Sequence, residues 1–195
     1  ILMCWLGSAE ARTALYVDGE GKFGFETIEV YVTDAPDEAP PRAAAFTSRK
    51  TSIANLGITR QTVWVRLTAV NQLDPQLLRE RGARHWFLDL GSTTLGDVQL
   101  HHYVEGTLRH SDRSGFLMPF ENRSVPDRHM AFPIELGPGQ NDFYLRIRSD
   151  AMVTLSPVLV SEAAYATFSR TRSFLAGIIY GVLVIMLLYN ALVYC

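Results

Sequence analysis

Cysteine is scarce in this chain, whose 195 residues include only Cys4 and Cys195. Both lie in apolar segments at the ends, so the long middle of the chain has neither disulfides nor thiol chemistry. Positive charge is not in excess, because 18 Lys and Arg stand against 20 Asp and Glu. A net charge of −2 excludes a polybasic nucleic-acid binder, and we expect no nucleic-acid partner.

Catalytic signatures are also missing. The sequence has no G-x-S-x-G, Walker A, H-E-x-x-H or C-x-x-C motif, and no pair of carboxylates stands out. His101, His102 and His110 suggest a metal at first sight. Neighbouring side chains on a strand point to opposite faces, however, so His101 and His102 are poorly placed to share an ion. We therefore expect no enzyme in this segment, and no metal or other cofactor.

What the chain does have is a long charge-free run at its end, from Phe174 to Cys195. As a helix this run is long enough to cross a hydrocarbon core of about 30 Å. Asn190 is costly in lipid unless it bonds to a neighbouring helix, and Gly177 and Gly181 let another helix approach closely. The run predicts the first membrane helix of a multi-helix bundle, with a single-pass anchor as the alternative.

The opposite end is apolar as well. Residues 1–7 are followed by Ser8-Ala9-Glu10-Ala11, whose small residues suit signal peptidase. We interpret residues 1–11 as the end of a signal peptide, with a short apolar first strand as the alternative. A cleaved signal would place the folded middle of the chain outside the membrane, anchored by the C-terminal helix.

Between the two ends, short apolar-rich runs alternate with turn residues. This spacing predicts an all-β fold, a jelly-roll β-sandwich, followed by one transmembrane helix. Residues 12–45 would form a strand and a linker rich in Pro and Ala, residues 46–168 the jelly-roll domain, and residues 174–195 the membrane helix. A helical turn is expected within 76–84 and a tight turn at 137–141. The expected strands fall within 27–33, 62–71, 85–90, 97–106, 128–136, 142–149 and 153–161, with a further apolar run at 115–120.

Two of these strands carry the same pattern on the face that does not point to the core. Trp64 and Arg66 alternate with apolar residues on one strand, and Tyr144, Arg146 and Arg148 do so on the other. An aromatic ring can stack on a sugar, and Arg offers a rigid fork of donors for hydroxyls or carboxylates. Ligand binding is one interpretation of this face, and ordinary cross-strand packing is the alternative.

A polar segment, 109–128, is the second candidate site. Gly115, Pro119 and Pro126 predict a loop, and loops over a sandwich commonly bind ligands. Arg123, with Arg113 and Arg128, could reach an anionic ligand; solvated loop charge is the alternative.

The order of several short motifs resembles a known family. These motifs are Asn55-Leu56-Gly57-Ile58, Val63-Trp64-Val65-Arg66-Leu67, Leu95-Gly96-Asp97-Val98, Pro119-Phe120, Tyr144-Leu145-Arg146 and, in the apolar run, Tyr180-Gly181 and Tyr189-Asn190. Residues 46–195 are thereby similar to the type 2 extracellular domain and first membrane helix of bacterial seven-transmembrane receptors with diverse intracellular signalling modules. The resemblance implies a jelly roll like that of carbohydrate-binding modules, in the periplasm and anchored in the bacterial inner membrane. It also implies a cytoplasmic output such as a histidine kinase or a diguanylate cyclase.

Two hypotheses follow from the sequence. In the first, the domain senses a carbohydrate-like or anionic small molecule through Trp64, Arg66, Tyr144 and Arg146, or through Arg123. In the second, the same surface binds a periplasmic protein or a second copy of the chain, and controls assembly of the receptor. A membrane-anchored glycan hydrolase is disfavoured, because no nucleophile or metal motif is present.

Overall fold

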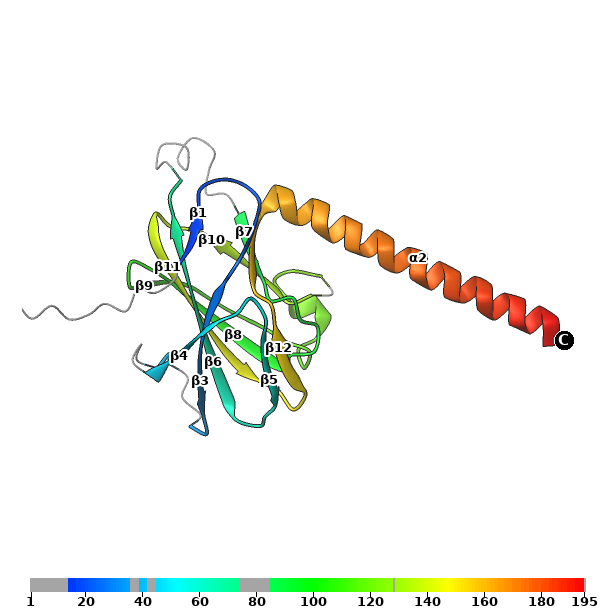
Figure 1. Cartoon of the computed structure of the whole chain (residues 1–195), viewed down its shortest axis with the longest axis horizontal. Helices are drawn as coiled ribbons and strands as arrows, with labels where there is room; N and C mark the ends of the chain where they lie inside the picture. Colours follow the sequence, from blue (N-terminus) through cyan, green and yellow to red (C-terminus); the bar gives the residue numbers. More distant parts are fainter. Residues whose placement is uncertain (1–13, 36–38, 42–44, 74–84, 128, 195) are drawn as a thin grey trace, which may run out of the picture.

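A computed structural model of the chain describes residues 14–35, 39–41, 45–73, 85–127 and 129–194 (Figure 1). They form a β-sandwich from which one long helix projects. The signal-peptide end predicted at 1–11 and the helical turn predicted within 76–84 lie outside the described residues.

The larger sheet provides most of the frame. Its strands run in the order β4 (Thr47–Lys50), β3 (Thr27–Thr33), β6 (Thr62–Asn71), β11 (Gly139–Arg148), β8 (Asp97–Val104) and β9 (Thr107–Ser114). Every neighbouring pair in this order is antiparallel, and β1 (Leu15–Val17) adds to the end of β6 in parallel. The two central strands, β6 and β11, are the longest, with 10 residues each.

The smaller sheet closes the sandwich. Its order is β10 (Ala131–Glu135), β7 (His85–Asp89), β13 (Val158–Ser161) and β2 (Lys22–Gly24). A separate two-stranded sheet pairs β12 (Met152–Leu155) with β5 (Ala54–Ile58). Because β1 and β3 belong to the larger sheet and β2 to the smaller one, residues 15–33 are an integral part of the sandwich.

The core lies between the two sheets, where the alternation on β6 and β11 predicts it. Val63, Val65 and Leu67 on β6 are at most 1% exposed, and every second residue of β11 from Phe143 to Ile147 is fully buried. The smaller sheet supplies Trp86 and Leu88 from β7 and Phe132 from β10 to the same cluster. Each such side chain contributes about 1.5–3 kcal/mol when it leaves water, so this layer holds the sheets together.

The structure corrects the prediction of a loop over 109–128. Residues 109–114 belong to β9, the edge strand of the larger sheet, and only the part after Ser114 is irregular, with a short 3₁₀ helix, η2 (Phe120–Asn122). The polar sequence concealed the strand because most of its side chains are exposed at the sheet edge. The apolar run 115–120 does not form a strand, and the run 153–161 is divided into β12 and β13 around Ser156 and Pro157.

A long helix, α2 (Glu162–Tyr194), starts directly after β13. Its segment Phe174–Tyr194 has a mean hydropathy of 2.2, is not buried by the sandwich, and is long and apolar enough to cross a membrane. The predicted class, a β-sandwich followed by one such helix, is therefore confirmed. Its assignment as a jelly roll stays a prediction.

The first turns of α2 are fixed to the sandwich by Tyr165. Its ring stacks on that of Phe87 from β7, with centroids 4.3 Å apart, and its hydroxyl donates a hydrogen bond of 2.8 Å to Asp127 Oδ2. Val125, Ala131 and Val160 complete this small apolar cluster. The apolar helix is therefore joined to the smaller sheet through a packed contact as well as through the chain.

Leu145→Ala tests the position of the core. Leu145 is fully buried in the centre of β11, so truncation should lower the free energy of unfolding by about 2–5 kcal/mol. Leu108→Ala is the matched control, because Leu108 is 49% exposed and its loss should change stability by no more than about 0.5 kcal/mol. Urea unfolding followed by tryptophan fluorescence measures both, and equal effects would contradict the assignment of the core.

Candidate functional site

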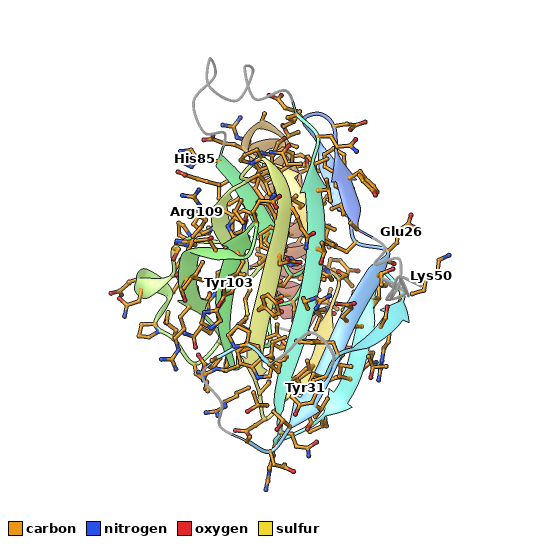
Figure 2. The ribbon with its side chains drawn as sticks, turned by 90° about the vertical axis from the view of Figure 1, so that its left-hand side faces the viewer. Glu26, Tyr31, Lys50, His85, Tyr103 and Arg109 are labelled. Atoms are coloured by element: carbon orange, nitrogen blue, oxygen red, sulfur yellow. The ribbon has the colours of Figure 1, made fainter. Side chains whose placement is uncertain are left out.

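The outer face of the larger sheet, which points away from the core, is covered over its central strands. Figure 2 looks onto this face, with Tyr31 and Tyr103 labelled on it. Trp64 is fully buried there, and Arg66 and Arg146 are only 2% and 7% exposed. A strand that is buried on both faces is unusual when one face carries charged side chains, so the contacts of these residues need an explanation.

Phe46 forms part of the cover. Its ring lies 6.1 Å from the ring of Tyr31 and 6.0 Å from that of Tyr144, and the Arg66 guanidinium carbon lies 5.6 Å from its centroid. Phe46 thus closes over Arg66 with aromatic neighbours on both sides.

Two carboxylates neutralise some of the charge. Arg66 Nε lies 2.6 Å from Glu29 Oε2, on the neighbouring strand β3. On β8, Asp97 lies between two arginines: Oδ1 accepts a hydrogen bond of 2.6 Å from Arg113 Nε, and Oδ2 lies 3.9 Å from Arg146 Nη2. Three guanidinium groups therefore meet two carboxylates, which leaves this cluster with one excess positive charge.

Several hydrogen-bonding atoms on this face have no partner. Trp64 Nε1, Arg66 Nη1 and Arg146 Nε are buried N–H donors without an acceptor among the described residues. An unsatisfied buried polar group typically costs about 1–3 kcal/mol, and more when it is charged. We call Glu29, Trp64, Arg66, Asp97, His101, Tyr144 and Arg146 the polar face.

His101 contributes the one unpartnered acceptor. Its ring stacks on Trp64 at 6.0 Å, and its Nδ1 lies 3.3 Å from Ser111 Oγ, whose own proton goes to the carbonyl of Leu100. Nδ1 is therefore the protonated nitrogen, and Nε2, which is buried with no partner in the described part of the chain, carries the lone pair. Burial, and then the charge of Arg146, lowers the pKa of His101 below its ordinary value of 6.5, so the ring is neutral at pH 7.

The structure brings four of the five predicted binding residues together. In the register of β6 with β11, Arg66 pairs with Tyr144 and Trp64 pairs with Arg146. The fifth, Arg123, lies in the loop after β9, where its Nη2 donates to the carbonyl of Gly115 at 3.2 Å and its guanidinium covers the Phe120 ring at 5.3 Å. Through these contacts Arg123 stabilises the loop between Gly115 and Phe120.

Sequence reasoning missed the partners of these residues. Glu29, Asp97 and His101 occupy alternate positions on predicted strands, so the pattern contained a signal for their common face. Phe46 had no such signal, because in the sequence it follows a stretch rich in Pro and Ala that predicts no strand. Arg113 was expected in a loop, yet it reaches the polar face from β9, and Arg128 lies outside the described residues.

The prediction that His101 and His102 face opposite sides is confirmed. His101 lies on the polar face, while His102 points between the sheets and stacks on Phe143 at 4.6 Å. Within the part of the chain that the structure describes, no three His, Cys, Asp or Glu side chains are placed to hold a metal ion.

Comparison with known proteins agrees with this architecture. A family model described as 7TMR-DISM extracellular 2 matches residues 10–161, which is well over half of the chain and ends where the sandwich ends. No curated protein matches the chain.

Glu29→Gln tests whether the ion pair on the polar face is structural. The substitution leaves the Arg66 charge buried without its carboxylate, and we expect a loss of about 3 kcal/mol of unfolding free energy. The double variant Glu29→Leu/Arg66→Met removes both charges and should recover most of that loss. Urea unfolding measures the three proteins, and a double variant less stable than Glu29→Gln would contradict this role.

The two buried histidines predict how stability depends on pH. Burial is the largest cause that lowers the pKa of both His101 and His102 in the folded state, so the unfolded chain binds more protons below pH 6.5. Their contribution to stability is therefore complete above pH 6.5 and is lost as the pH falls towards the lowered values. Melting temperatures from pH 7.5 to 5.0 should fall less steeply in His101→Gln/His102→Gln than in the wild type. Parallel profiles would rule out the explanation.

Proposed function

The chain belongs to the 7TMR-DISM extracellular 2 family, and from this premise we propose that its polar face binds the ligand to which the receptor responds. The domain is the outward-facing sensing part of a membrane-anchored signalling receptor. Our proposal adds a site, a class of ligand and a route for the signal.

The unpartnered donors of the polar face carry this proposal. Trp64 Nε1, Arg66 Nη1 and Arg146 Nε come from two adjacent strands, in paired or neighbouring register positions. Native proteins rarely bury several such donors side by side, because each one lost its water without gaining an acceptor. A ligand with several acceptor oxygens would satisfy them together.

The chemistry of the face selects the class of ligand. The guanidinium forks of Arg66 and Arg146, with Arg113 beside Asp97, favour a carboxylate or another oxyanion. The rings of Tyr31, Phe46 and Tyr144 lie beside these groups and offer flat surfaces against which a sugar ring can stack. An acidic, carbohydrate-like molecule combines both properties and is the ligand that we propose.

Entry of such a ligand requires the cover to open. Phe46 lies over Arg66, so the ligand would compete with the Phe46 side chain. The bound and free states then differ in the position of that side chain, and a ligand shifts their populations by its difference in affinity. The signal would continue through the sandwich to Tyr165 and α2, and across the bacterial inner membrane from the periplasm to a kinase or cyclase module.

One observation favours a second candidate function, control of receptor assembly. Phe116, Leu117 and Phe120 lie in one loop and are 66%, 73% and 52% exposed. Clustered exposed apolar side chains are common in protein–protein contacts. A second copy of the domain could cover this loop, and assembly rather than a small molecule would then be the input.

Thermal unfolding with added ligands separates the two functions. Glucuronate, galacturonate, N-acetylmuramate, neutral N-acetylglucosamine and sulfate form the panel. A ligand at 100 times its dissociation constant adds about 2.7 kcal/mol, which raises the melting temperature by several degrees. We expect an acidic sugar to produce this shift.

The variants place the site. Trp64→Phe keeps the ring but removes the indole donor, and Arg146→Gln removes the charge, so both should reduce the shift by at least half. Arg49→Gln, on the exposed strand β4, is the matched control and should keep it. A flat panel, together with a sedimentation mass that rises with concentration and falls in Leu117→Ser, would favour assembly instead.

A further inference from the structure

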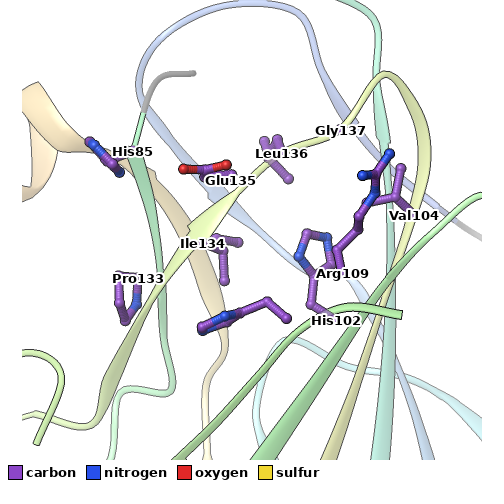
Figure 3. Close-up of a pocket in the computed structure, with 10 residues that line it drawn as sticks. His85, His102, Val104, Arg109, Pro133, Ile134, Glu135, Leu136 and Gly137 are labelled. Carbon is purple, nitrogen blue, oxygen red and sulfur yellow. The ribbon is translucent and has the colours of Figure 1, made fainter. Parts of the chain in front are cut away.

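A pocket with a volume of about 520 Å³ lies away from the polar face, on the inner side of the larger sheet (Figure 3). It opens between β8 and β9 at the edge of that sheet and β10 at the edge of the smaller one, with His85 of β7 at its rim. Pockets that bind small molecules usually enclose about 300–1,000 Å³. The size therefore suits an occupant of about the dimensions of an amino acid or a sugar.

A β-bulge turns charged side chains towards this pocket. In the pairing of β8 with β9, His102 lies opposite His110 and Tyr103 lies opposite Leu108, so Arg109 is an extra residue without a partner across the strands. Such bulges re-aim side chains and are frequent near functional sites. Here both Arg109 and His110 line the pocket, whereas strict alternation would have sent one of them to the opposite face.

His102 lines the pocket and has a ring nitrogen without a partner among the described residues. Asn141 donates through Nδ2 to the carbonyls of Gly137 and Gly139 and accepts the Gly137 N–H at Oδ1. The 3.0 Å contact between His102 Nε2 and Asn141 Oδ1 therefore requires a proton on Nε2. The lone pair is left on Nδ1, which has no hydrogen-bond partner among the residues that the structure describes although His102 is only 1% exposed.

Burial keeps this imidazole neutral. Desolvation, its largest cause, lowers the pKa of His102, and the charges of His110 and Arg109 act in the same direction. The hydrogen bond to Asn141 and the charge of Asp142 oppose the shift but do not reverse it. At pH 7, the neutral His102 ring therefore offers Nδ1 as a hydrogen-bond acceptor, and no described residue donates to it.

Two opposite charges face the same space. Arg109 comes from β9 and Glu135 from β10, and neither side chain forms an ion pair or hydrogen bond with any residue that the structure describes. Figure 3 shows them on separate sides of the pocket, with Leu136 between them. Val104, Pro133, Ile134 and Leu136 give the wall an apolar part. A cation, an anion, a neutral acceptor and an apolar surface therefore line the same pocket, with no ion pair between Arg109 and Glu135.

From this arrangement we propose that the pocket between β9 and β10 is a second ligand site, which takes a small zwitterion with an apolar body, such as a free aliphatic amino acid. Its carboxylate pairs with the Arg109 fork, and its ammonium donates to Glu135 and to His102 Nδ1. Its side chain packs on Ile134 and Leu136. The site is independent of the polar face, since the two lie on opposite sides of the larger sheet.

The pocket is also close to the start of the apolar helix. On β7, His85 lines the pocket and Phe87 stacks on Tyr165 of α2. On β10, Glu135 lines the pocket and Ala131 belongs to the small apolar cluster around Tyr165. A ligand that joins β9 to β10 therefore contacts one of the strands that contribute to the apolar cluster around Tyr165. This position allows occupancy of the pocket to reach α2 directly.

Calorimetric titration of the purified full chain, in lipid nanodiscs at pH 7.5, tests the site with L-leucine and 5-aminopentanoate. The two probes differ in the distance between their charges. Leucinamide lacks the carboxylate and N-acetylleucine lacks the ammonium, so each should bind at least 10-fold more weakly than L-leucine. Arg109→Gln and Glu135→Gln should each weaken L-leucine binding at least 10-fold. Both side chains are exposed, so these variants should keep the wild-type melting temperature.

Matched control variants each remove a charge of the same sign from a residue outside the pocket. Arg60→Gln and Glu26→Gln alter exposed residues that do not line the pocket and should leave L-leucine binding unchanged. Trp64→Phe, on the polar face, should also leave it unchanged, which separates this site from the one proposed above. The proposal is overturned if neither zwitterion binds, if N-acetylleucine binds as tightly as L-leucine, or if the Arg109 and Glu135 variants bind like the controls.

Discussion

Burial of β6 on both faces is the constraint on which the rest of the structure depends. Val63, Val65 and Leu67 face the core, and the same strand sends Trp64 and Arg66 to a face that Phe46 helps to cover. A guanidinium that is 2% exposed must have a counter-charge, and β3 supplies it through Glu29. The pairing of β3 with β6 places Glu29 beside the buried Arg66 charge, and Phe46 shields that charge from solvent.

The sequence predicted the central strands and their core faces, but it predicted neither the cover of the outer face nor the edge strand β9. Alternation placed β6 and β11 with the correct core faces, and it also separated His101 from His102. It did not predict that the outer face is covered, because Phe46 lies outside the alternating runs and packs against Tyr31 and Tyr144, which belong to other strands. β9 was predicted as a loop because an exposed edge strand with a bulge at Arg109 has neither apolar alternation nor regular register.

The two candidate sites differ in how they can influence the helix. The polar face lies on the side of the larger sheet that points away from the smaller one, so a signal from it has to cross the core before it reaches Tyr165. The pocket lies between the sheets and shares β7 and β10 with the cluster that holds α2. A receptor domain with both sites could respond to one ligand and be modulated by another, since each ligand would shift the same contact between the sandwich and α2.

The central claim is that the unpartnered donors of the polar face are kept for an acceptor-rich ligand. The most direct measurement is a ¹H–¹⁵N spectrum that follows the Trp64 indole N–H and the Nε–H groups of Arg66 and Arg146 during titration with glucuronate. We predict that the Trp64 and Arg146 signals move downfield together and become protected from exchange with solvent, as expected for donors that gain an acceptor. Binding of an acidic sugar that leaves both signals in place would contradict the account.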